Sequence, residues 1–165
     1  MSYRLDIITN AKSWAAPFDH KPDPADLRGF FVEAGCEQVP TLEQATRSLS
    51  LPNGCYLGNS AKDIRHWCGV FATAVLSESG LGVWWTLQGG KMKNGPGVGV
   101  SIHYGHQGIQ PGDVGYFTKH SHHFIVTDIR GSLFDSVDGN SDDNMIRTKV
   151  GRPLASINAY YRIEG

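Results

Sequence analysis

The chain has 165 residues, of which 40% are hydrophobic and 19% charged, as expected for one globular domain with a sizeable core. Fifteen Lys and Arg residues face sixteen Asp and Glu residues, giving a formal net charge of −1. No basic stripe or charge run is present, which argues against nucleic acid or an anionic membrane as a partner. We expect a single domain over 1–165, with a helical, turn-rich part (1–60) before the part that carries the candidate chemistry (61–165).

The first residues, Met1 to Thr9, lack the apolar core and the small-residue cleavage site of a signal peptide. No stretch approaches the ~20 apolar residues of a membrane span. We therefore expect synthesis in the cytoplasm, followed either by export through a non-Sec route or by release on lysis.

Two short helices are expected within residues 1–60. Asp23 is placed to cap the first of them, with Pro24 at its first position and apolar residues following at helical spacing. The Thr41-Leu42-Glu43-Gln44 segment predicts a capping box for a second helix that runs through Leu49.

A third helix is expected around an apolar run, Val70 to Leu76, which follows Trp67-Cys68-Gly69. Asp63 is its candidate cap, and we expect it to run to about Ser79 and to stop at Gly80. Its faces are nearly all apolar, which predicts burial on most sides.

The second half of the chain changes character. Residues 89–112 are rich in glycine and predict a long loop bordering a cleft. Five short β-runs follow, with Arg130-Gly131 as a turn between two of them. Helices first and a meander afterwards predict an α+β fold with about five antiparallel strands. The expected strands are Asp113–Phe117, His123–Ile129, Ser132–Val137, Met145–Val150 and Ile157–Ile163.

The three cysteines, Cys36, Cys55 and Cys68, show no C-x-x-C motif and no even-numbered framework. One disulfide, Cys36–Cys55, is possible by count, but three reduced thiols fit a cytoplasmic origin better. Cys68 is the candidate nucleophile, because the positive end of a helix favours a thiolate. The alternative is a small buried core residue.

A histidine pair, His122-His123, precedes a β-run and supplies a candidate base for that thiolate. Asp138 is the candidate group that orients the imidazole, and Asn140 is the alternative. Asp138-Gly139-Asn140 is also a good turn sequence. The backbone N–H of Cys68 and of a neighbour would hold an oxyanion. Together these residues indicate a cysteine hydrolase.

Four segments of the chain resemble, in the same order, motifs of the CHAP and NlpC group of papain-like amidases and peptidases. The segment 67–71 resembles the nucleophile helix, and 111–117 resembles the Pro-Gly-Asp strand. The segment 122–126 resembles the histidine strand, and 137–140 the acidic-x-Asn segment. The resemblance covers roughly residues 60–163 and implies a papain-like α+β fold in which the nucleophile helix packs on the sheet.

The family usually has Gly-His where this chain has His122-His123, so either histidine can be the base. Aligned on the helical partner, His123 takes the place of the family's histidine. Counting back from the hydrophobic run favours His122 instead. Successive strand residues face opposite ways, which predicts that only one of them meets Cys68. We take His123 as the base and His122 as the alternative.

A zinc site is the rival chemistry, because five histidines lie in one region of the chain and could assemble a ligand set together with Cys68. Their spacing is not that of a known zinc motif, so we expect no metal and no cofactor. The histidines are His103, His106, His120, His122 and His123.

The resemblance implies hydrolysis of an amide in bacterial peptidoglycan, at the stem peptide or at the muramoyl–alanine bond. It fits a small toxin or effector, whose partner would be an inhibitor or immunity protein, and equally a phage lysin module. The alternatives are a thiol acyltransferase or protease toxin on the same fold, and a non-catalytic binding module.

Overall fold

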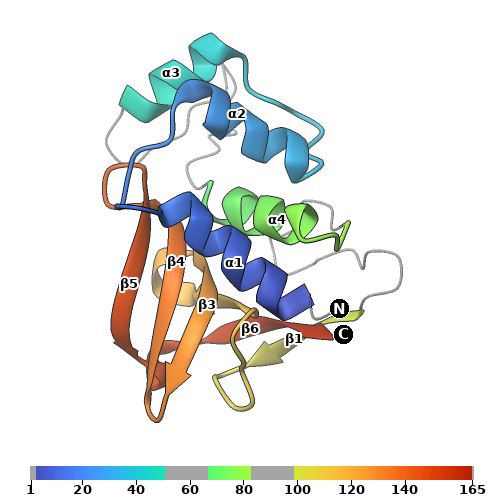
Figure 1. The fold of residues 1–165 in the computed structure, drawn as a ribbon, viewed down its shortest axis with the longest axis vertical. Coiled ribbons are helices and arrows are strands. Elements are labelled where there is room, and N and C mark those ends of the chain that lie inside the picture. The colour runs from blue at the N-terminus through green and yellow to red at the C-terminus, as the bar shows by residue number, and fades with distance from the viewer. Residues whose placement is uncertain (1–2, 51–66, 83–98, 165) are drawn as a thin grey trace.

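The computed structural model describes residues 3–50, 67–82 and 99–164, which Figure 1 draws as ribbon. These residues form four α-helices and one six-stranded antiparallel sheet, so the expected α+β class is confirmed. The strand order is β1-β6-β2-β3-β4-β5. The elements are α1 (Tyr3–Ala15), α2 (Pro24–Glu33), α3 (Leu42–Ser50), α4 (Cys68–Glu78), β1 (Gly99–Tyr104), β2 (Val114–Phe117), η1 (Thr118–His120), β3 (His122–Arg130), β4 (Leu133–Ser141), β5 (Met145–Pro153), η2 (Leu154–Ser156) and β6 (Ala159–Glu164).

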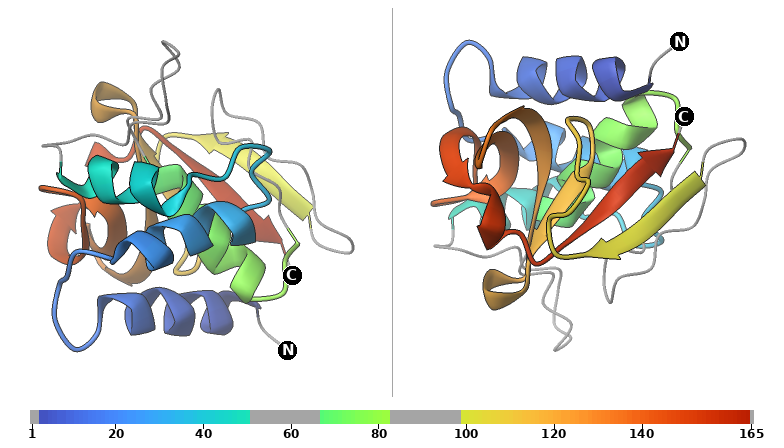
Figure 2. Two further views of the ribbon diagram at one scale, coloured as in Figure 1. Left: turned by 90° about the horizontal axis from the view of Figure 1, so that it is seen from above. Right: turned by 90° about the horizontal axis from the view of Figure 1, so that it is seen from below.

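All four helices lie on the same side of the sheet, in two layers (Figures 1 and 2). The inner layer consists of α1 and α4, which pack on β3 and β4. The outer layer consists of α2, which packs on α4, and α3, which packs on α2. The inner helix α4 is apolar almost all round and buried from Cys68 to Leu76, because it has sheet on one side and helix on the other.

Two of the three predicted helix caps are confirmed. Asp23 accepts hydrogen bonds from the backbone N–H groups of Ala25 and Asp26 at the start of α2. Thr41 and Gln44 exchange side-chain-to-backbone hydrogen bonds at the start of α3, which is the capping-box pattern. These local signals need no tertiary contact, which is why the sequence alone revealed them.

Two elements were not predicted. The helix α1 buries only three small or medium side chains, Ile7, Ala11 and Ala15, so its apolar pattern is weak in the sequence. The strand β1 lies inside 89–112, where we expected a loop; it pairs with β6 at one edge and makes the sheet six-stranded. The predicted cap Asp63 and the cysteine Cys55 lie outside the described residues.

Both faces of the sheet carry an apolar cluster. On the helix side, Ile125 and Val137 pack with α1, α2 and α4. On the opposite side, Phe124, Val126 and Phe134 form a second cluster. Neighbouring residues of β3 therefore enter different environments, as alternation along a strand requires.

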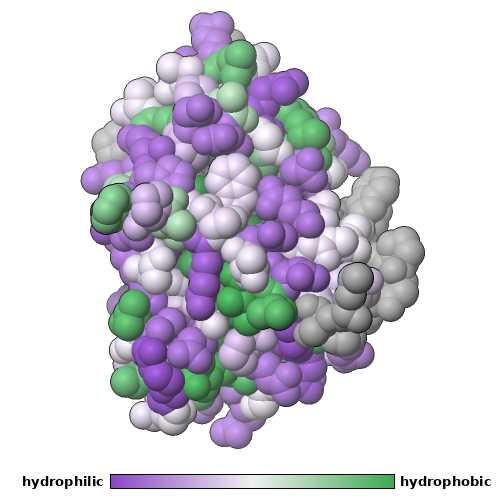
Figure 3. Space-filling model, viewed as in Figure 1, coloured by the Kyte–Doolittle hydropathy of each residue, from purple (hydrophilic) through white to green (hydrophobic). Residues whose placement is uncertain are grey.

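The face shown in Figure 3 presents apolar side chains in small patches among polar ones. None of the described helices is both long and apolar enough to cross a membrane.

Candidate active site

The thiol of Cys68 lies at the first residue of α4, where the backbone N–H groups of the first turn have no partner within the helix. The residue is 1% exposed. Close packing sets the position of α4: a Cβ built on Gly139 of β4 would come within 2.6 Å of the Phe71 side chain. Glycine at 139 thus lets the helix approach the sheet and brings the thiol to the head of β3.

The head of β3 surrounds the sulfur with backbone and imidazole groups. The backbone N–H of His123 points to the Cys68 Sγ at 3.5 Å, and His123 Nδ1 lies 4.0 Å from the same atom. The thiol in turn reaches the carbonyl oxygen of Ser121 at 3.8 Å. Ser121 has φ 46°, in the left-handed region that favours glycine, so the strand begins with a sharp change of direction.

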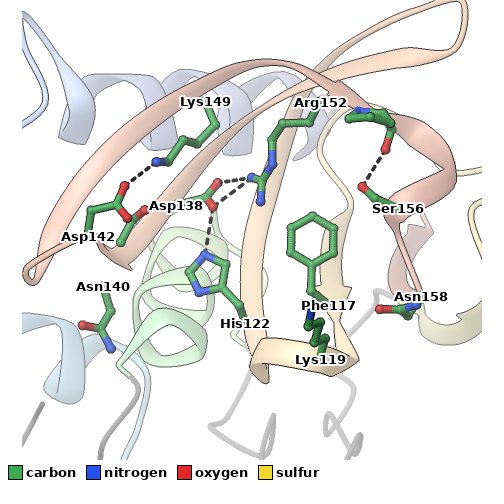
Figure 4. A pocket seen from close by; sticks show the side chains of 12 residues that line it. Phe117, Lys119, His122, Asp138, Asn140, Asp142, Lys149, Arg152, Ser156 and Asn158 are labelled. Carbon is green, nitrogen blue, oxygen red and sulfur yellow. Dashed lines mark hydrogen bonds and ion pairs between the residues drawn. The ribbon is translucent and has the colours of Figure 1, made fainter. Parts of the chain in front are cut away.

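The neighbouring histidine, His122, forms a hydrogen bond with the carboxylate of Asp138. His122 Nε2 lies 2.8 Å from Asp138 Oδ2, and Asp138 is 1% exposed (Figure 4). The same carboxylate accepts hydrogen bonds from Arg152 Nη1 at 2.9 Å and from the Ser136 hydroxyl at 2.5 Å. With two cationic partners and one hydroxyl, a buried carboxylate stays charged and holds the His122 ring in one orientation.

Charges at the site favour a thiolate next to an imidazolium. Burial alone would raise the pKa of the Cys68 thiol, but hydrogen bonds from His122 and His123 and the positive charge of both rings outweigh it and hold that pKa at about 5. Burial would lower the pKa of His122, yet its hydrogen bonds to Asp138 and Cys68 raise it to about 9. Burial also disfavours the charged Asp138, but its contacts with His122 and Arg152 hold the pKa of that carboxyl below its usual range.

A second free thiol shows the contrast. Cys36 follows the C-terminal end of α2, and its burial raises its pKa to about 12. Among the described residues, no imidazole offsets the burial of Cys36. The two cysteines thus differ in the groups around them and not in the chemistry of the side chain.

The structure brings together Cys68, His122, His123 and Asp138. The acid, Asp138, accepts its imidazole hydrogen bond from His122, whereas His123, which the alignment favoured, packs its ring on Tyr116 and Tyr161. Both rings lie close enough to lower the pKa of the thiol, although we expected only one to reach it.

Asn140 lines a cleft beside His122, but the group bonded to the His122 ring is Asp138. Arg152 was not foreseen. Its only sequence signal is a basic residue at the end of an expected strand, and its position over Asp138 depends on the pairing of β4 with β5.

The Pro-Gly-Asp segment, 111–113, stabilises the packing of α1 against the sheet. Asp113 is fully buried and forms an ion pair with Arg4 of α1 at 2.7 Å. It also accepts hydrogen bonds from the backbone N–H groups of Gln110 and Ile163. Arg4 donates in addition to the carbonyl oxygens of Pro111 and Ile163. This network fastens α1 to β6 and to the start of β2.

A cleft of about 670 Å³ opens beside His122, on the face of the sheet away from the helices. The residues around it come from β2, η1, β4, β5 and η2 (Figure 4). The side chain of His122 is 17% exposed and lies between this cleft and the buried thiol. A substrate in the cleft would thus meet the imidazole first.

Among the described residues, no group of three or more His, Cys, Asp or Glu side chains is arranged to hold a metal ion. His103 packs its ring on Tyr160 and lies 2.9 Å from the Ser101 hydroxyl, on β1. It is thus engaged away from the cysteine.

Comparisons with models of protein families, with curated proteins and with solved structures find no match for this chain.

Proposed function

We propose that the protein is a cysteine hydrolase with a papain-like arrangement, in which Cys68 is the nucleophile, His122 the base and Asp138 the group that orients it. One observation carries the proposal: the His122–Asp138 hydrogen bond of 2.8 Å, made by an imidazole that neighbours, at the start of β3, the groups in contact with the Cys68 thiol. Nucleophile, base and orienting acid in this order constitute a triad.

The choice of His122 over His123 rests on three features. Only His122 has the carboxylate, and it has one nitrogen on Asp138 and the other left for the thiol. The residue before it, Ser121, has the backbone conformation that favours glycine, which fits the Gly-His pattern of the family it resembles. His123 then has a different part: its backbone N–H and its ring steady the sulfur.

The reaction follows from these positions. The thiolate attacks the carbonyl carbon of an amide, and backbone N–H groups at the start of α4 stabilise the oxyanion. Because Nε2 of His122 is held by Asp138, its Nδ1 gives a proton to the leaving amine as the C–N bond breaks. A water then loses a proton to Nδ1 and attacks the thioester, which releases the acid and restores the thiolate.

The sequence resemblance supplies the substrate class. It favours an amide of bacterial peptidoglycan, cut in the stem peptide or between muramic acid and alanine. A cell-wall-degrading toxin with an immunity protein as partner fits this reading, as does a phage lysin module.

Product analysis distinguishes the two catalytic alternatives, and the reactivity of Cys68 distinguishes the non-catalytic one. A thiol acyltransferase would pass the acyl group to an amine or lipid, and a protease toxin would cut host proteins. A non-catalytic binding module would have an inert Cys68.

The test is to incubate purified muropeptides with the protein and to identify the products by mass. The Cys68→Ala variant should lose hydrolysis by several orders of magnitude, since the covalent nucleophile is gone. Cys36→Ala is the matched control, a free cysteine outside the site, and should keep the activity. Equal activity in the Cys68→Ala variant would overturn the cysteine mechanism.

A further inference from the structure

We propose that the cleft beside His122 binds a carboxylate or another anionic group of the substrate, held by Lys119 and Arg152. This inference rests on the proposed function, since it concerns the substrate of the same site. It goes beyond it by naming the charge that the substrate presents.

The cations of the cleft outnumber its anions. Three basic side chains, Lys119, Lys149 and Arg152, line it together with His122, against two acidic ones. The Cys68 thiolate balances the protonated His122, so three positive charges of the cleft stand against two negative charges.

Both carboxylates are already engaged. Asp142 forms ion pairs with Lys149 at 2.5 Å and with Arg147 at 3.4 Å. Asp138 is held by His122 and Arg152. The excess of positive charge is therefore left for a ligand.

Lys119 and Arg152 each retain donors. Lys119, on η1, is exposed and has no ion-pair partner within the described part of the chain. Arg152 makes its hydrogen bonds there through Nη1, to Asp138 and Ser136. Its Nη2 thus remains available, and a guanidinium is well suited to a carboxylate.

An aromatic ring keeps Arg152 in place. Its guanidinium carbon lies 4.5 Å from the centre of the Phe117 ring and 4.8 Å from that of Phe124. Phe117 also lines the cleft, two residues before Lys119 in the chain (Figure 4). The cleft thus combines an apolar wall with Arg152, which is held in place, and the exposed Lys119, an arrangement that suits an acidic residue of a peptide.

The test uses two thiol-reactive probes of nearly the same size, N-chloroacetyl-glutamic acid amide and N-chloroacetyl-glutamine amide. Both alkylate a thiolate with loss of chloride, and they differ in one negative charge. We expect the glutamate probe to label Cys68 about fivefold faster than the glutamine probe relative to glutathione, the size of one exposed ion pair. Added salt should reduce this preference.

The Lys119→Ala variant should bring the ratio of the two rates close to that of glutathione, while Lys12→Ala, on α1, should keep the wild-type ratio. A wild-type ratio equal to that of glutathione, or a Lys119→Ala variant that keeps the wild-type ratio, would overturn the inference. Iodoacetamide separates this from the proposed function: a Cys68 that reacts with it only at alkaline pH would contradict the thiolate itself.

Discussion

The two faces of the sheet differ at the start of β3, where His122 and His123 point to opposite faces. On the helix side, His123 is 6% exposed and packs between aromatic rings, with its backbone N–H on the sulfur of Cys68. On the open side, His122 meets Asp138 and borders the cleft. Both imidazoles influence the same thiol, yet only one has a carboxylate and a route to solvent.

In the proposed mechanism, these two environments suit the neighbouring histidines to separate tasks. A base must exchange protons with substrate, so it needs exposure and a charged partner that favours the imidazolium. A group that steadies the sulfur needs burial and close packing. Alternation along a strand provides both environments within two residues.

The largest expected effect separates the two histidines. His122→Ala should reduce muropeptide turnover by about 10²–10⁴-fold, the usual contribution of a general acid–base group. His123→Ala, its matched partner, should reduce turnover much less. Initial rates of both variants, with circular dichroism as a check on folding, make the comparison. A larger loss of turnover in His123→Ala than in His122→Ala would show that His123 is the base.

The two thiols should differ in alkylation at neutral pH. With pKa values of about 5 and about 12, Cys68 and Cys36 differ by about five orders of magnitude in thiolate fraction at pH 7. The greater nucleophilicity of the more basic thiolate offsets part of this, leaving about two orders of magnitude in rate. Iodoacetamide labelling followed by peptide mass analysis measures both sites. Faster labelling of Cys36 than of Cys68 would contradict an ion pair between the Cys68 thiolate and an imidazolium.

Asp138, the carboxylate bonded to His122, should set the pH above which activity falls. Turnover should rise as the pH passes about 5, where Cys68 ionises, and fall past about 9, where His122 loses its proton. In Asp138→Asn, loss of the negative charge should move the alkaline limb down by about 1–3 pH units. Asp128→Asn, on β3 and exposed, is the control. An alkaline limb that stays in place in Asp138→Asn would mean that Asp138 does not act on the base.

The smallest effect concerns packing on the helix side. Gly139→Ala would force a Cβ against Phe71 and should lower the free energy of unfolding by about 1–3 kcal/mol. Gly29→Ala, in α2, meets nothing within 4 Å and should raise it by about 0.4–1 kcal/mol. Denaturant titration measures both. An unchanged stability in Gly139→Ala would show that α4 can move away from β4 without cost.

The sequence predicted those features that arise from local chemistry. The caps at Asp23 and Thr41 and the apolar run of α4 depend on residues close in the chain, and so does the turn between β3 and β4, which lies at 131–132, one residue later than predicted. It did not predict α1, whose few buried side chains give little pattern. Nor did it predict β1, which depends on pairing with β6 from far along the chain.

For the candidate site, the residues themselves were all present in the sequence, and their types already suggested a thiol, a base and an acid. The sequence did not show which histidine meets which partner, because His122 and His123 are the same residue type and differ only in the face of β3 on which they lie. Register across β3, β4 and β5 brings Asp138 and Arg152 to the side of His122. Sequence alone thus determined which groups are available, and the tertiary structure decided which of them meet, since side-chain direction in a sheet is fixed by pairing between distant segments.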